Sequence, residues 1–140
     1  MVTSITALLQ NTFAPAEIQK RTRHLQRGDT ANPLDLVEAL EAQGYEPEAQ
    51  VSQKGEIALR GGILDIYPPT GNWPVRLEFF GDELESLREF DPLTQISRQE
   101  ITAISLPPAG ELGLLKASKS TDPAPVSLLE YLPAQTILVW

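Results

Sequence analysis

The chain has 140 residues, 41% of them hydrophobic, which is enough to fill the core of one small domain. Its 11 basic and 19 acidic residues give a net charge of −8, which disfavours general binding to a phosphate backbone. The absence of cysteine excludes disulfide bonds, thiolate catalysis and cysteine-ligated metals. Residues 1–15 do not have the pattern of a signal peptide and no apolar run approaches a membrane span, so we expect a cytoplasmic protein that makes no membrane contact.

The first half of the chain predicts one main helix. After an apolar piece near helical spacing, residues 19–26 are polar and compatible with a strand. Asn32 can cap a helix, Pro33 suits its first position and Gly44 suits a left-handed cap at its end. The apolar stripe of this helix is predicted to consist of Leu34, Leu36, Val37 and Leu40.

From residue 45 the hydrophobic period changes to two, which predicts strands. Gly61 and Gly62 predict a bulge or sharp bend, and Gly81 with Asp82 suits a two-residue hairpin turn. The spacing of three between Leu84 and Leu87 predicts a further bulge. The predicted strands cover residues 56–60, 63–67, 75–80, 83–90 and 101–106. The fold class is therefore α+β, with a small, twisted, mostly antiparallel sheet that contains bulges, and one main helix.

The remaining residues predict a connector and a returning segment. Residues 110–125 are rich in Gly, Ser, Lys and Pro, which is typical of a flexible connector. Residues 126–132 predict a short helical turn that ends before Pro133. Residues 136–140 predict a buried strand.

Motifs for catalysis and cofactor binding are missing from the sequence. It has no phosphate-binding loop, no dinucleotide fingerprint, no zinc-protease motif and no serine-nucleophile motif. His24 lies among arginines and predicts a surface position, and the acidic residues 82–91 lack the spacing of a calcium loop. We expect no catalytic residue, no metal and no cofactor. Asp65, between two apolar residues, needs backbone donors or an arginine as its partner.

The strand at residues 75–80 has the most informative pattern. Because side chains alternate, Arg76, Glu78 and Phe80 share the face opposite the core. An aromatic beside an arginine is the composition of a protein-binding hot spot. In the competing interpretation, Phe80 packs under another part of its own domain and Arg76 pairs with Glu78 or Glu85. Alternation alone favours this second interpretation slightly, because single exposed apolar residues are normal.

A longer pattern resembles the second domain of the bacterial transcription-repair coupling factor (Mfd) family. The matching residues are RGGILDIYPP at 60–69, PVRLEFFGDELESLR at 74–88, FDP at 90–92 and TQ at 94–95. UvrB contains a similar domain and is the alternative, but Gly62 and the Thr-Gln pair look more like the coupling factor.

The resemblance implies a non-catalytic domain that binds UvrA through Arg60, Arg76 and Phe80. It also implies a parent protein that is an ATP-dependent DNA translocase and contacts RNA polymerase, DNA and ATP through other domains. Residues 1–20 would then be a remnant of a preceding helicase-like domain, residues 21–109 the UvrA-binding domain, and residues 110–140 a connector and a returning segment of the first domain.

A different class of function is a β-rich domain that binds single-stranded nucleic acid. Trp73, Phe79 and Phe80 would stack on the bases in that case. The net charge of −8 and the lack of a basic groove count against it.

Overall fold

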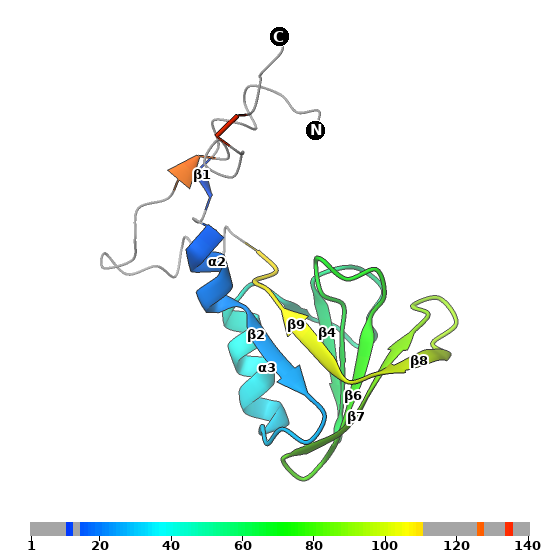
Figure 1. Cartoon of the computed structure of the whole chain (residues 1–140). Helices are drawn as coiled ribbons and strands as arrows, with labels where there is room; N and C mark the ends of the chain where they lie inside the picture. The colour runs from blue at the N-terminus through cyan, green and yellow to red at the C-terminus, as the bar shows by residue number, and fades with distance from the viewer. Residues whose placement is uncertain (1–10, 13–14, 111–125, 128–133, 136–140) are drawn as a thin grey trace.

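The computed structural model describes residues 11–12, 15–110, 126–127 and 134–135. Its centre is a six-stranded sheet in the order β3-β4-β5-β6-β7-β8, in which only the β3–β4 pair is parallel (Figure 1). The strands of this sheet are β3 (Glu46–Pro47), β4 (Glu56–Arg60), β5 (Ile63–Ile66), β6 (Val75–Phe80), β7 (Glu83–Phe90) and β8 (Ser97–Ile101). This mostly antiparallel, strand-rich architecture confirms the predicted α+β class.

One face of the sheet is covered by a helix and a pair of strands, and the main core lies beneath them. Helix α3 (Pro33–Ala42) and the antiparallel pair of β2 (Arg23–Gln26) and β9 (Ala103–Leu106) lie on this side (Figure 1). Because strand residues alternate, every second side chain of the sheet points into this core. The core cluster contains Leu25, Leu36, Leu40, Tyr45, Ile57, Leu64, Ile66, Val75, Leu77, Leu84, Leu87, Ile104 and Leu106.

Helix α3 begins and ends as its sequence predicts. The Asn32 Oδ1 accepts hydrogen bonds from the backbone N–H groups of Leu34 at 2.9 Å and Asp35 at 3.3 Å. Gly44 has φ +91° just beyond the last turn, in the left-handed region that favours glycine. Leu36 and Leu40 are buried, but Leu34 is 68% exposed, so its place in the apolar stripe was predicted wrongly. Leu34 and Leu36 are two residues apart, which at about 100° per residue places Leu34 on the other side of the helix from the buried Leu36.

The two hairpins of the sheet also follow their local sequence. Gly61 and Gly62 join β4 to β5, Gly81 and Asp82 join β6 to β7, and the first glycine of each turn has φ +62°. The pairing of β6 with β7 shifts register between Glu78 and Phe79, which confirms the predicted bulge.

Three segments differ from their predictions. Residues 19–21 belong to helix α2 (Pro15–Arg21), which has an acid in its first turn and two bases in its last, so the strand starts only at Arg23. The predicted strand at 101–106 is divided, since Ile101 ends β8 and the rest forms β9. Strand β8 was missed because its first four residues are all exposed and show no apolar alternation.

Near the end of the chain, β10 (Val126–Ser127) pairs with β1 (Asn11–Thr12). The helical turn predicted from residue 126 is therefore wrong at its first two residues. Strand pairing between distant segments is not visible in local sequence. The rest of that turn, most of the predicted connector, the strand predicted at 136–140 and the apolar piece before residue 11 lie outside the described residues. Within the described part of the chain, no helix has the length and apolar character needed to cross a membrane.

Candidate protein-binding site

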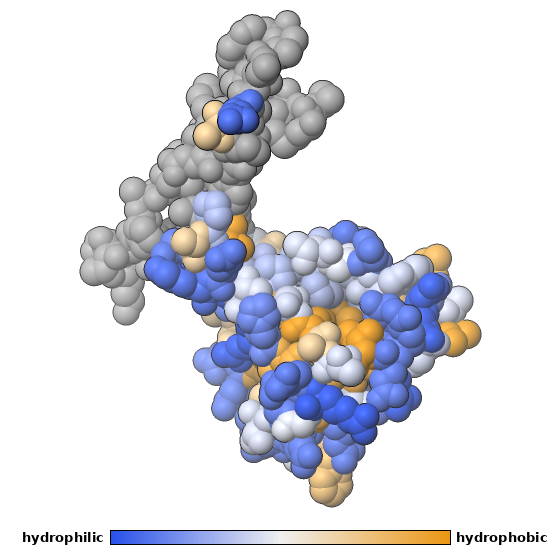
Figure 2. Space-filling view, viewed as in Figure 1, coloured by the Kyte–Doolittle hydropathy of each residue, from blue (hydrophilic) through white to orange (hydrophobic). Residues whose placement is uncertain are grey.

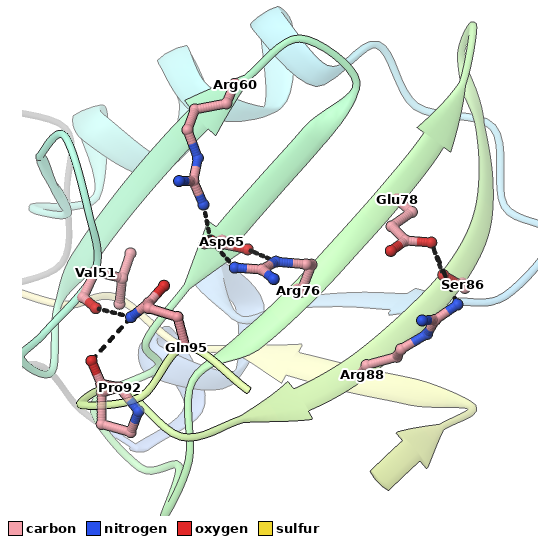
Figure 3. Close-up of polar contacts among 9 residues, drawn as sticks. All are labelled: Val51, Arg60, Asp65, Arg76, Glu78, Ser86, Arg88, Pro92 and Gln95. Carbon is pink, nitrogen blue, oxygen red and sulfur yellow. Dashed lines mark hydrogen bonds and ion pairs between the residues drawn. The ribbon is translucent and has the colours of Figure 1, made fainter. Parts of the chain in front are cut away.

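The second face of the sheet, which we call the outer face, contains a buried carboxylate between two arginines. Asp65 on β5 is fully buried and lies opposite Arg76 of β6 in the strand register. Its Oδ2 accepts hydrogen bonds from Arg60 Nη2 at 2.7 Å and Arg76 Nη2 at 2.8 Å, and its Oδ1 accepts one from Arg76 Nε at 2.7 Å (Figure 3). We call these three residues the Arg–Asp cluster. Of the two kinds of partner predicted for Asp65, backbone donors or an arginine, the structure shows arginines.

The two arginines of the Arg–Asp cluster are not equally accessible. The Arg76 side chain is 18% exposed, binds both Asp65 oxygens and lies with its guanidinium 4.7 Å from the centroid of the Phe90 ring. The hydrogen bond to Asp65 raises the pKa of Arg76 above its ordinary value. The Arg60 side chain is 51% exposed and makes one hydrogen bond to Asp65. Arg60 is therefore the arginine with more surface available to a partner.

The proposed pairing of Arg76 with Glu78 or Glu85 is wrong, because Asp65 is its partner. Glu78 instead accepts a hydrogen bond from Ser86 Oγ at 2.8 Å and lies 3.5 Å from Arg88 Nη2 (Figure 3). Asp65 lies on the neighbouring strand β5, directly opposite Arg76 in the register. It therefore binds Arg76 in preference to Glu78, which lies on the same strand as Arg76.

Phe80, the last residue of β6, is 75% exposed. The interpretation in which it packs under its own domain is therefore wrong. In Figure 2 hydrophobic surface appears at the end of the β6–β7 hairpin, at the bottom of the view, with hydrophilic surface around it. A single exposed apolar residue is normal on a protein surface, but an aromatic ring beside charged residues is suited to anchor a partner.

The hairpin that positions Phe80 is braced by the segment before helix α3. The Ala31 N–H donates to the carbonyl of Asp82 at 2.7 Å, and the Leu84 N–H donates to the carbonyl of Asp29 at 2.9 Å. The Asn32 side chain also donates to Asp82 Oδ1 at 3.2 Å. Phe80 thus stands on a turn that is held from one side, rather than on a free loop.

Phe80 and the Arg–Asp cluster lie on the same face of the sheet, with Phe80 four residues beyond Arg76 along β6. The Phe79 N–H donates to the carbonyl of Gly62 at 2.7 Å, which brings the two hairpin turns together. Across the outer face, Arg60 pairs with Ile63, and Ile63 pairs with Glu78, two residues before Phe80. We call Arg60, Ile63, Glu78 and Phe80 the binding face.

Ile63 is a member of the binding face that sequence reasoning missed. Its side chain is 37% exposed, and it lies on the side of β5 opposite the buried Leu64. The alternation along residues 63–66 contained this signal, because an isoleucine on the outer side of a half-buried strand has no core to fill. Its position adds apolar surface between Arg60 and the hairpin of Phe80.

The opposite end of the outer face is covered. A second core cluster of Val51, Ala58 and Phe90 lies there, with Tyr67 packed against it. Gln95, which has φ 62°, closes the β7–β8 loop over this cluster, and its Nε2 donates to the carbonyls of Val51 at 3.3 Å and Pro92 at 2.8 Å (Figure 3). Away from this cluster the outer face is open, both at the binding face and at Arg88 of β7, whose side chain is 44% exposed.

The aromatic residues do not form one platform for stacking bases. Phe79 is partly buried against the main core, on the opposite side of β6 from Phe80. Trp73 is covered by Arg98, whose guanidinium lies 3.8 Å from the ring centroid. This arrangement argues against the nucleic-acid alternative.

The other polar residues considered from the sequence form no cluster suited to catalysis or metal binding in the described part of the chain. His24 hydrogen-bonds to Ser105 Oγ at 2.9 Å on the β2–β9 pair. Among the described residues, no group of three or more His, Cys, Asp or Glu side chains is arranged to hold a metal ion. The binding face is thus the strongest candidate for a functional site among the described residues.

Comparison with known proteins identifies the family of this chain. Residues 24–112, which include every strand of the six-stranded sheet, match the family model of the UvrB interaction domain. The chain belongs to the UvrB interaction domain family. The chain is 39% identical to the transcription-repair-coupling factor of Bacillus subtilis (strain 168), over 80% of this chain and 10% of that protein.

Two further relatives of the UvrB interaction domain carry the same name. It is 39% identical to the transcription-repair-coupling factor of Haemophilus influenzae, over 76% of this chain and 9% of the relative. It is 33% identical to that of Escherichia coli (strain K12), over 84% of this chain and 10% of the relative. The resemblance to the coupling factor is confirmed, and the chain spans about a tenth of the length of these curated relatives.

Proposed function

We propose that this UvrB interaction domain is a non-catalytic recognition module of a transcription-repair coupling factor, and that it recruits UvrA through the binding face. The observation on which the proposal depends is the exposed ring of Phe80, held on a braced hairpin beside Ile63 and Arg60. Buried aromatic anchors with neighbouring arginines account for most of the energy of many protein interfaces. Phe80 would fill an apolar pocket of UvrA, with Ile63 packed at the edge of that pocket.

The charge of the site supports a partner with an acidic side chain. Although the whole chain has a net charge of −8, the Arg–Asp cluster combines two guanidinium groups with one carboxylate and is locally positive. Arg60 is half-exposed and would donate to a UvrA carboxylate, and a charge-assisted bond of this kind is stronger than a neutral one. Electrostatic attraction of this kind adds mainly to specificity and association rate.

Arg76 has a more restricted part in this proposal. Its Nε and one Nη already bind Asp65, so it cannot offer a UvrA carboxylate the same two-point contact without leaving Asp65. It would offer a partner its remaining N–H groups, on Nη1 and Nη2, and hold the cluster together. RNA polymerase, DNA and ATP would be partners of other parts of the parent protein.

The proposal is tested by calorimetric titration of the chain with UvrA. Phe80→Ala is expected to weaken binding by about 2 kcal/mol, or roughly 30-fold, because it removes the anchor. Leu93→Ala is the matched control, since Leu93 is 90% exposed but lies in the β7–β8 loop at the other end of the sheet. The control should bind within about threefold of the wild type, on the scale of ordinary surface substitutions. Equal binding by wild type and Phe80→Ala would contradict the proposal.

A further inference from the structure

The buried carboxylate of Asp65 has no contact with solvent and cannot touch a partner directly. It is fully buried, and it accepts three hydrogen bonds from two arginines that come from neighbouring strands on either side of it. A buried ion pair is weak evidence for stability, because the loss of hydration offsets much of the attraction, and apolar residues often serve as well. An apolar side chain at position 65 would leave Arg76 without this partner.

We propose that Asp65 is a positioning residue for partner recognition: it sets the directions of the Arg60 and Arg76 guanidinium groups before UvrA arrives. This inference rests on the proposed function. Long arginine side chains lose rotamer freedom when they are held at an interface, and a site in which that freedom is already restricted binds more tightly. The bidentate contact to Arg76 and its stacking on Phe90 restrict one arginine, and the 2.7 Å contact restricts the other.

The same geometry defines the charge that the site accepts. Two guanidinium groups around one carboxylate leave a single net positive charge. Glu78 also lies on this face, but its carboxylate accepts a hydrogen bond from Ser86 and lies 3.5 Å from Arg88, so its charge is shared with a third arginine. The cluster therefore suits one carboxylate of the partner, on the same face of the sheet as Phe80. Asp65 would determine this preference without being part of the contact.

A double-mutant cycle separates positioning from a purely structural role. Asp65→Asn keeps the shape of the side chain but removes its charge and one of its acceptor oxygens. In the wild-type background it is expected to weaken UvrA binding at least tenfold. In the Arg60→Ala, Arg76→Met background, where there is no guanidinium left to position, it should change UvrA binding less than twofold.

Three outcomes of the cycle have different meanings. A wild-type chain that does not bind UvrA overturns the proposed function itself. If the wild type binds but Asp65→Asn binds equally well, the positioning role is overturned and the proposed function stands. If Asp65→Asn weakens binding by the same factor in both backgrounds, Asp65 acts through the fold and the positioning role is again overturned.

Nuclear magnetic resonance of the free wild-type chain tests the same point without any substitution, and so covers the case in which Asp65→Asn does not fold. The Arg76 Nε–Hε group donates to a buried carboxylate, so its cross-peak should be visible at neutral pH with hydrogen exchange at least tenfold slower than that of Arg98. The exchange should stay slow when UvrA is added. Exchange of Arg76 as fast as that of Arg98 would overturn the inference.

Discussion

The two faces of the six-stranded sheet use the same strands for different purposes. On the inner face, Leu64 and Leu77 are fully buried beneath α3 and the β2–β9 pair. On the outer face, the residues next to them in sequence are Asp65 and Arg76, which bind each other, and Phe80 at the end of β6 is left exposed. The inner face therefore maintains the fold, and the outer face is available for recognition. The comparison shows that alternation along a strand can separate stability from binding within six residues.

The largest expected effect is on the inner face. Leu77→Ala is expected to lower the free energy of unfolding by about 2–5 kcal/mol, because it removes a fully buried side chain and leaves a cavity. Chemical denaturation followed by circular dichroism measures this change. Phe80→Ala, three residues later, should change the same quantity by less than about 0.5 kcal/mol, as for other surface positions. Similar losses of unfolding free energy in the two variants would contradict the conclusion that the inner face alone maintains the fold.

An intermediate loss of stability is expected at Gly62, where the β4–β5 hairpin contacts the β6–β7 hairpin. A Cβ added at Gly62 would lie 2.7 Å from the backbone oxygen of Phe79, so Gly62→Ala must push the two hairpins apart. We expect a loss of about 1–3 kcal/mol in unfolding free energy, as for other overpacked sites. Because the shift would move Phe80, UvrA binding should fall as well.

Gly61→Ala is the matched control for that substitution. Gly61 has φ +62° but no atom within 4 Å of its added Cβ, so the variant strains the backbone without displacing β6. Stability should fall by about 1 kcal/mol, which is typical of alanine in the left-handed region. Binding of UvrA, measured by calorimetry, should stay close to the wild-type value. If Gly61→Ala lost binding and Gly62→Ala did not, the contact of Gly62 with Phe79 would not control the position of Phe80.

The smallest expected effect concerns the covered end of the outer face. Hydrogen bonds from the backbone N–H of Ser52, at 2.7 Å, and of Gln53, at 2.9 Å, lower the pKa of Glu56 below its ordinary value of 4.5, although its partial burial acts in the opposite direction. Because the folded-state pKa is lowered, the stabilisation is present above the ordinary value and is lost as pH falls through the lowered one.

Glu56→Gln tests this pH dependence. At pH 7 the substitution should cost less than about 1 kcal/mol, because Glu56 is accessible to solvent and screened. The difference from wild type in thermal unfolding should shrink as pH falls below 4.5 and vanish once the pH lies below the lowered pKa. A constant difference across this range would show that the carboxylate charge has no part. Binding of UvrA should not change, since Glu56 lies away from the binding face.

Local sequence was sufficient where short-range geometry controls the structure. The caps of α3 depend on Asn32 and Gly44, and the β6–β7 hairpin depends on Gly81 and the spacing of three between its leucines. Strand β8 was not predictable in this way, because it is a strand only through its pairing with β7 and has almost no buried side chain. The exposure of Leu34 could have been predicted, since residues two apart, such as Leu34 and Leu36, do not share a face of a helix.

The sequence by itself determined the α+β class, the order of the hairpins, the family, and the face of β6 on which Arg76 and Phe80 lie, because each depends on residues close together in the chain. The tertiary structure alone decided that Arg60 and Arg76 share Asp65, that Ile63 joins the binding face, and that the segment before α3 braces the hairpin of Phe80. These contacts join different strands and loops. Strand register and packing, which bring distant residues within hydrogen-bonding distance, are properties of the folded chain.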